Sequence, residues 1–234
     1  MQATPHIKTK LQSEPQTHVV TSNKRAIIGL ISGIVLFIPA LIVAHSHQLI
    51  GVNASIFHSI NNVSLPSGFI TVAKILTEGL GAGYAIAACV LIPLLFKRLR
   101  LGWRFFFVSG GSTVVFYVIK KIIDEPRPLA MLHGHLQQYV TETGPGFPSG
   151  HETVATVLAL TLWLILPSKW RWLLVFWIIV VGLSRIYLGV HTPVDIIGGF
   201  AVGLASVCFV QLLPHKIAKP LYLDNDKSLL EPDR

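Results

Sequence analysis

The sequence predicts an all-α protein that forms a bundle of six transmembrane helices. Apolar residues make up 52% of its 234 residues, and charged residues make up only 13%. A soluble domain of this length usually carries about 25% charged residues, so this composition indicates an integral membrane protein. The apolar residues also gather in long runs. We expect one membrane domain, residues 26–213, between polar cytoplasmic tails at residues 1–25 and 214–234.

The first apolar run, residues 26–44, is about long enough to cross the hydrocarbon core of a bilayer. It follows a polar segment and lacks a cleavage-site pattern, which favours a retained first span over a signal peptide. Residues 45–67 then form a polar loop, with some amphipathic character around Phe57. The chain therefore crosses once before this loop.

Five later apolar runs supply the other predicted spans. They cover residues 69–96, 103–119, 153–166, 172–183 and 194–213. Lys74, Glu78 and several glycines interrupt the first of these five, and residues 153–166 are short for a full crossing. The longest internal polar stretch, residues 120–150, separates the third span from the fourth.

Lysine and arginine set the expected orientation of the bundle. Six spans place both termini on one side, and most of the basic residues fall on that side: Lys8, Lys10, Lys24, Arg25, Lys97, Arg98, Arg100, Arg104, Lys169, Arg171, Lys216 and Lys219. The loop at residues 45–67 contains no lysine or arginine. Because cytoplasmic loops are enriched in these residues, we expect cytoplasmic termini.

The formal charge of +8 could indicate nucleic-acid binding. The cations lie at the ends of apolar runs, as in a membrane protein, so we expect membrane lipids as partners and no nucleic acid. Cys89 and Cys208 both fall inside apolar runs, which predicts buried thiols and no disulfide or metal framework.

Three polar clusters carry the candidate chemistry, and all of them fall on the predicted outer face. Their members are Lys120 and Arg127-Pro128, then Pro148-Ser149-Gly150-His151, then Ser184-Arg185 with His191 and Asp195. Arginine offers a planar fork to phosphate oxygens, and N–H groups at a helix start bind anions. An outward cluster of cations departs from the usual charge bias, and an anionic substrate is the simplest explanation.

Each cluster also has a purely structural interpretation. Ser149 with Glu152, and Thr192 with Asp195, fit helix-capping patterns. Lys120 could be an interfacial lysine that extends toward water, and Arg127 a loop cation. None of these alternatives explains why the cations, the two histidines and the caps fall on one face.

The three clusters, in this order and spacing, resemble the signature of the type 2 phosphatidic acid phosphatase superfamily. That superfamily includes membrane lipid phosphatases, soluble acid phosphatases and vanadium haloperoxidases. The resemblance covers about residues 69–213, and every signature position is filled.

The resemblance implies a role for each residue. His191 would be the nucleophile and form a phosphohistidine, with Asp195 holding its tautomer. His151 would protonate the leaving oxygen and then activate water. The remaining positions would hold the phosphoryl oxygens, namely Lys120, Arg127, Ser149, Gly150 and Arg185. No metal and no cofactor are expected, and the predicted site lacks a carboxylate cluster suited to magnesium.

The expected function is therefore hydrolysis of a lipid phosphate or diphosphate, with the active site at the outer membrane–water interface. Undecaprenyl diphosphate, phosphatidylglycerophosphate and phosphatidic acid are candidate substrates, the first slightly favoured because the site faces outward. The compact size resembles bacterial lipid phosphatases, so a bacterial plasma membrane is expected. The alternatives are a lipid phosphotransferase, a non-catalytic transporter or scaffold on the same fold, and, least favoured, a haloperoxidase.

Weaker candidates lie around this site. His133 and His135 could touch a head group, although a solvated loop is the simpler interpretation. Lys74 and Glu78, four residues apart, could form an ion pair or line the substrate pocket.

Overall fold

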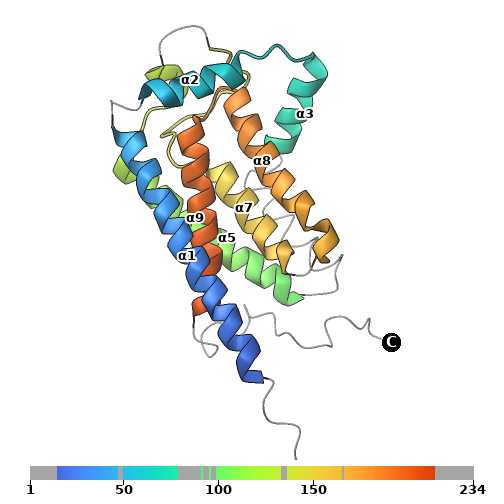
Figure 1. The fold of residues 1–234 in the computed structure, drawn as a ribbon. Coiled ribbons are helices and arrows are strands. Elements are labelled where there is room, and N and C mark those ends of the chain that lie inside the picture. The colour runs from blue at the N-terminus through green and yellow to red at the C-terminus, as the bar shows by residue number, and fades with distance from the viewer. Residues whose placement is uncertain are drawn as a thin grey trace, which may run out of the picture.

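The computed structural model describes residues 15–46, 50–78, 91, 95, 99–132, 136–164 and 166–213. All regular secondary structure in these residues is helical (Figure 1). The helices are α1 (Pro15–His45), α2 (Ile50–Asn61), α3 (Ser67–Glu78), α5 (Leu99–Ile123), α6 (Pro128–Met131), α7 (Gly150–Trp163), α8 (Arg171–Tyr187) and α9 (Pro193–Leu212), with a 3-10 turn, η1 (Ser168–Trp170), before α8. The predicted all-α class is thereby confirmed for this part of the chain.

Four of the described helical segments are long and apolar enough to cross a membrane. They are Asn23–His45, Gly102–Met131, Ser168–Tyr187 and Pro193–Leu212. They coincide with the first, third, fifth and sixth predicted runs. Most of the second run lies outside the described residues, beyond the end of α3 at Glu78. The structure therefore supports several membrane spans, and the total of six stays a prediction.

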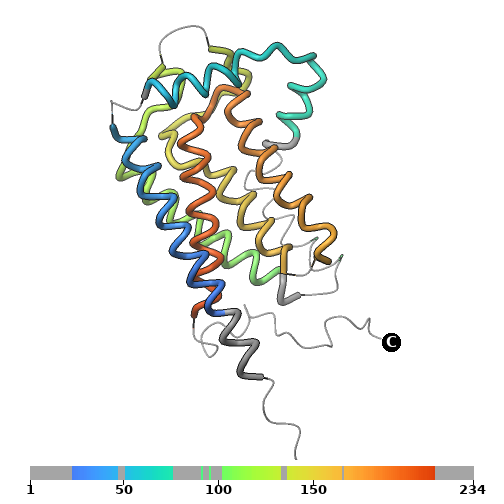
Figure 2. The backbone as a smooth tube through the Cα atoms, viewed as in Figure 1, coloured from blue at the N-terminus to red at the C-terminus, as the bar shows by residue number. Residues whose placement is uncertain are grey.

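The fourth predicted run forms α7, which is shorter than a membrane span. Its 14 residues rise only about 21 Å, against about 30 Å of hydrocarbon core. The helix packs against α5, α8 and α9, and it lies behind the gap between α8 and α9 in Figure 2. Ala155, Val157 and Ala159 are almost fully buried there. The apolar character of α7 thus serves contacts inside the bundle.

Glycines on α9 allow α7 to approach closely. A Cβ atom at Gly199 would lie 2.4 Å from the carbonyl oxygen of Ser149, and one at Gly203 would lie 2.7 Å from Cβ of Thr156. The Thr153 hydroxyl bridges the two helices by donating to the carbonyls of Ser149 at 2.9 Å and Gly199 at 3.1 Å. Small residues commonly allow such contacts between membrane helices. Gly199 therefore fixes the position of Ser149 against α9.

This contact gives a first prediction, for the Gly199→Ala variant. The added methyl group meets backbone that cannot move aside without shifting Ser149, so we expect a loss of about 1–3 kcal/mol of stability and a lower turnover. Gly110→Ala on α5 is the matched control, since nothing lies within 4 Å of a Cβ at Gly110. Thermal unfolding in detergent, together with an activity assay, measures both effects. Equal behaviour of the two variants would contradict the packing argument.

The predicted polar loop after the first span contains a helix, α2, which lies across one end of the bundle (Figure 1). Its amphipathic pattern buries Phe57 against Leu132 and Ile186. The Asn61 side chain donates to the carbonyls of Gln137 at 2.7 Å and Tyr187 at 2.9 Å. Helix α2 therefore joins the end of α8 to the long connection that follows α6.

Helix α1 begins at Pro15, before the apolar run, so it includes the second part of the segment predicted as a polar tail. It lies alongside α9 (Figures 1 and 2). Gly33 faces Ala205 in this contact, and Gly29 faces Cys208. Cys208 is buried with a free thiol, as predicted, while Cys89 lies outside the described residues.

Candidate active site

The three polar clusters meet at the end of the bundle that α2 covers. Their positions in the fold are the start of α6 for Arg127, the start of α7 for Ser149, Gly150 and His151, the last turn of α8 for Arg185, the α8–α9 connection for His191, and the first turn of α9 for Asp195. Ser149, Arg185, His191 and Asp195 are all at most 2% exposed. Residues up to 68 positions apart thus form one buried polar site.

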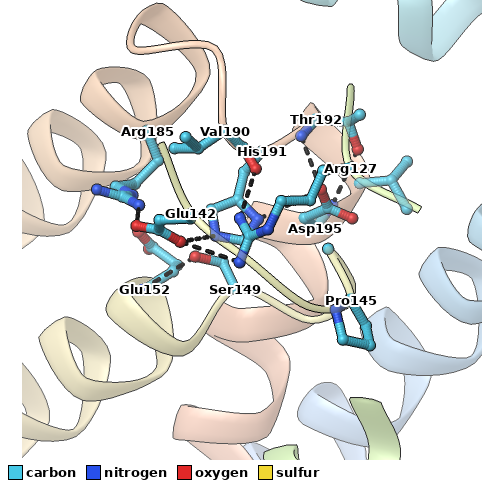
Figure 3. A network of polar contacts seen from close by, with 12 residues as sticks. Arg127, Glu142, Pro145, Ser149, Glu152, Arg185, Val190, His191, Thr192 and Asp195 are labelled. Atoms are coloured by element: carbon cyan, nitrogen blue, oxygen red, sulfur yellow. Dashed lines mark hydrogen bonds and ion pairs between the residues drawn. The ribbon is translucent and has the colours of Figure 1, made fainter. Parts of the chain in front are cut away.

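The carboxylate of Glu142 lies at the centre of this site (Figure 3). Arg127 Nη2 is 3.0 Å from its Oε2, and Arg185 Nη2 donates a hydrogen bond to its Oε1. His191 Nε2 lies 4.0 Å from Oε2, and His151 Nδ1 lies 4.0 Å from Oε1. Two guanidinium groups and two imidazoles therefore surround one oxyanion.

Glu142 is the site residue that the sequence analysis missed. It lies in the long polar stretch between the first two clusters, where a carboxylate usually faces solvent. Its only distinguishing signal is its place between two cation-bearing clusters.

His191 and Asp195 form the contact that the resemblance implies. His191 Nδ1 lies 3.4 Å from Asp195 Oδ2, so Nε2 is the nitrogen that faces Glu142. The same Oδ2 accepts a hydrogen bond from the N–H of Thr192 at 2.7 Å, which completes a capping box at the start of α9. Capping and the orientation of His191 therefore use one carboxylate.

Ser149 and Gly150 shape the start of α7. The Ser149 hydroxyl accepts from the N–H of Glu152 at 3.4 Å, and the Ser149 N–H donates to the carbonyl of Asp195 at 2.9 Å. A Cβ at Gly150 would lie 3.0 Å from the ring of Phe116. The Ser149 hydroxyl thus caps the helix, and the positive end of the α7 dipole lies at the site.

Lys120 stands beside the site and not at its centre. Its Nζ donates to the carbonyls of Pro145 at 2.6 Å and Gly146 at 3.2 Å. Arg127 makes similar backbone contacts, with Nε donating to Gly144 and Nη1 to Val190, in addition to its ion pair with Glu142. Both cations therefore also fix the connection that carries Glu142.

Burial and the surrounding cations keep both imidazoles neutral. Burial, together with the charges of Arg127 and Lys120, lowers the pKa of His151 to about 4. Burial also lowers the pKa of His191 well below its usual value, and Arg185 is the largest electrostatic contributor. At neutral pH His191 therefore has one unprotonated nitrogen, which a nucleophile requires.

The lowered pKa of His191 predicts the position of the acid limb in the pH profile of kcat/KM. The neutral form of His191 is the reactive one, so activity is present above its pKa and is lost as pH falls through it. We expect this limb to lie below pH 6.5, the ordinary histidine value, because the pKa is lowered. Steady-state kinetics with two soluble phosphate esters of different phosphate pKa would separate substrate ionisation from that of the enzyme. A limb common to both esters at or above pH 6.5 would contradict the prediction.

The weaker candidates around the site stay predictions. His133 and His135 lie outside the described residues, as does the side chain of Glu78. Among the described residues, no group of three or more histidine, cysteine, aspartate or glutamate side chains could hold a metal ion.

Comparison with known proteins identifies the family. A model of the PAP2 superfamily matches residues 101–219, which include all three clusters. The chain is a member of the PAP2 superfamily. The expectation from the three motifs is thereby confirmed: this PAP2 protein is an integral membrane lipid phosphatase.

Curated relatives of this PAP2 protein include two named lipid phosphatases. It is 30% identical over 161 residues to an undecaprenyl-diphosphatase of Sulfolobus acidocaldarius, covering 67% of this chain and 75% of the relative. It is also 30% identical over 152 residues to phosphatidylglycerophosphatase B of Bacillus subtilis, covering 57% of this chain and 72% of the relative.

The fold of this PAP2 protein also matches a solved structure. The crystal structure of a transmembrane PAP2 type phosphatidylglycerolphosphate phosphatase from Bacillus subtilis aligns with a TM-score of 0.66 at 23% identity, covering 83% of this chain and 98% of the other. At this identity the likeness establishes a shared fold.

Proposed function

We propose that this PAP2 phosphatase hydrolyses a lipid phosphate or diphosphate through a phosphohistidine on His191. The observation that supports this most directly is the Glu142 carboxylate, held between Arg127 and Arg185 and facing both histidines. A phosphoryl group carries oxygens of the same kind and binds the same donors. Glu142 therefore marks the position that the substrate phosphoryl group would take.

In the first step, the phosphoryl group displaces the Glu142 carboxylate, and His191 Nε2 attacks phosphorus. The N–P bond forms as the P–O bond to the lipid breaks, and His151 gives a proton to the leaving oxygen. His151 is neutral without substrate, and the incoming anion raises its pKa toward the protonated form. Arg127, Arg185 and the start of α7 stabilise the charge on the equatorial oxygens.

In the second step, His151 accepts a proton from water as the water oxygen attacks phosphorus. The N–P bond breaks and inorganic phosphate is released, which restores neutral His191. Asp195 stays ionised and holds the Nδ1 proton of His191 in both steps.

Undecaprenyl diphosphate is the substrate we favour, with phosphatidylglycerophosphate and phosphatidic acid next. Two considerations support it: the expected outward-facing site, and the relative from Sulfolobus acidocaldarius that is named for this activity. The contact between His191 and Asp195 argues against a transporter or scaffold, which would need neither group.

The purified protein in detergent, assayed against these three lipids, tests the proposal. We expect release of inorganic phosphate, inhibition by vanadate as a mimic of the five-coordinate transition state, and full activity in EDTA. Phosphate transfer to an added lipid alcohol in place of release would make the protein a phosphotransferase. Activity lost in EDTA and restored by magnesium would contradict the metal-independent mechanism.

We also propose that the site faces outward and that both termini are cytoplasmic. Two serine-to-cysteine variants test this orientation in a Cys89→Ala, Cys208→Ala background. Ser64 lies between α2 and α3 on the side of the site, and Ser168 lies at the opposite end of the bundle; both are exposed. A membrane-impermeant thiol reagent should label Ser64→Cys in intact cells, and Ser168→Cys only after the membrane is opened. The reverse pattern would place the site in the cytoplasm.

A further inference from the structure

Two buried asparagines lie on the face of α2 that meets the ends of α8 and α9 (Figure 1). Asn53, Phe57 and Asn61 follow one another at intervals of four residues, so their side chains share one face of the helix. All three are at most 7% exposed. Burial of an amide side chain is costly unless its polar atoms find partners, so the partners of Asn53 and Asn61 show what this face of α2 does.

Asn61 holds the turn that ends α8. Its Nδ2 donates to the carbonyls of Tyr187 at 2.9 Å and Gln137 at 2.7 Å, and its Oδ1 accepts from the N–H of Gln137 at 2.7 Å. Both amide donors are thereby used. Gly189, with a φ of +80°, allows Gln137 to cross this turn, since a Cβ atom at Gly189 would clash with the Gln137 carbonyl oxygen.

Asn53 holds the start of α9. Its Oδ1 accepts a hydrogen bond from the N–H of Val194 at 3.2 Å. The N–H groups in the first turn of a helix have no partner within that helix, so α2 supplies one here. Tyr187 precedes His191 by four residues, and Val194 follows it by three. Helix α2 therefore holds the backbone on both sides of His191.

We propose that Asn53 and Asn61 are positioning residues for His191. The inference rests on the proposed function, in which His191 is the nucleophile. Both asparagines act through the backbone of residues 187–194, the segment that joins Arg185 to the start of α9. They are eight residues apart on one helix, so α2 fixes their separation at a rise of about 12 Å. A displacement of about 1 Å at a reacting group can cost about a hundredfold in rate.

The Asn61→Asp variant tests the contact with the end of α8. It keeps the size of the side chain and the acceptor for Gln137, but it removes both donors and leaves the Tyr187 carbonyl without its partner. We expect kcat for a water-soluble phosphate ester to fall about tenfold to a hundredfold, with KM changed by less than about twofold. Asn62→Asp is the matched control, since Asn62 is the next residue and is exposed. Wild-type kcat in Asn61→Asp would overturn the proposal.

Asn53→Leu tests the contact with the start of α9 and introduces no charge, so it serves even where Asn61→Asp does not fold. It removes the acceptor of the Val194 N–H, and we expect kcat to fall about tenfold at a similar KM. Thermal unfolding in detergent separates positioning from stability. A lower Tm with an unchanged kcat for the folded protein would overturn the proposal.

Calorimetric binding of vanadate gives a result that does not depend on turnover. Vanadate mimics the five-coordinate transition state, so its affinity should fall in Asn61→Asp and Asn53→Leu by about the same factor as kcat. Unchanged vanadate affinity in both variants would overturn the positioning role. A wild-type protein that binds vanadate but releases no phosphate from the three lipids would instead remove the proposed function, and weaker vanadate binding by the two variants would still support the positioning role.

Discussion

Replacement of His191 by alanine should abolish turnover while the fold remains intact. Nε2 of His191 is the nitrogen that faces the oxyanion position, 4.0 Å from Glu142 Oε2. Without this nitrogen the covalent intermediate cannot form. We expect kcat/KM to fall by more than about a hundredfold, which is at least about 2.7 kcal/mol of transition-state stabilisation.

The Asp195→Asn variant is the informative companion to this experiment. The imidazole of His191 stays, and an asparagine oxygen can still accept the N–H of Thr192 that now bonds to Asp195 at 2.7 Å. The tautomer of His191 is less well fixed, so a small residual rate should remain. Rapid quenching with a labelled substrate should trap phosphohistidine in the wild type and none in His191→Ala. An alanine variant that kept more than about a hundredth of the wild-type kcat/KM would contradict the nucleophile assignment.

Arg185→Lys should be the most damaging of the charge-conserving changes. Arg185 is fully buried, and its guanidinium contacts the central carboxylate directly. Lysine keeps the charge but loses the planar fork, so contacts to two equatorial oxygens become one. We expect kcat to fall by about tenfold to a hundredfold, or roughly 1.4–2.7 kcal/mol, because these contacts are strongest in the transition state.

Two comparisons make the Arg185 result specific. Arg127→Lys should also lose activity, because Arg127 holds Gly144 and Val190 as well as Glu142. Arg25→Lys, exposed at the opposite end of α1, should keep wild-type kinetics. A tenfold rise in KM at unchanged kcat would instead make Arg185 a docking residue for the head group. Wild-type kinetics for Arg185→Lys would remove it from the site.

Much of the fold and site follows from local sequence patterns. Long apolar runs predict helices because every backbone polar group must be satisfied within the bilayer. The spacing of Thr192 and Asp195 predicts a cap, and the resemblance implies a contact between His191 and Asp195; both are present. The residues of each pair are close together in the chain, so the sequence is enough to find them.

The features that the sequence did not reveal depend on tertiary contacts. Glu142 is distinctive only because Arg127 and Arg185 reach it from two other segments. Lys120 contacts the carbonyls of Pro145 and Gly146, which no residue pattern encodes. The fourth apolar run forms α7, and the run alone does not reveal that α5, α8 and α9 enclose it.

The carboxylate of Glu142 makes substrate binding an exchange of one anion for another. The cations at the site are already partly neutralised before the substrate arrives, so the measured affinity is the difference between two sets of contacts. This lowers the affinity for every phosphoryl ligand, including inorganic phosphate after hydrolysis. Because Glu142 is part of the chain, it returns to the site at a high effective concentration when the product leaves. A built-in competitor of this kind favours turnover at a membrane where substrate is concentrated and product must escape into water.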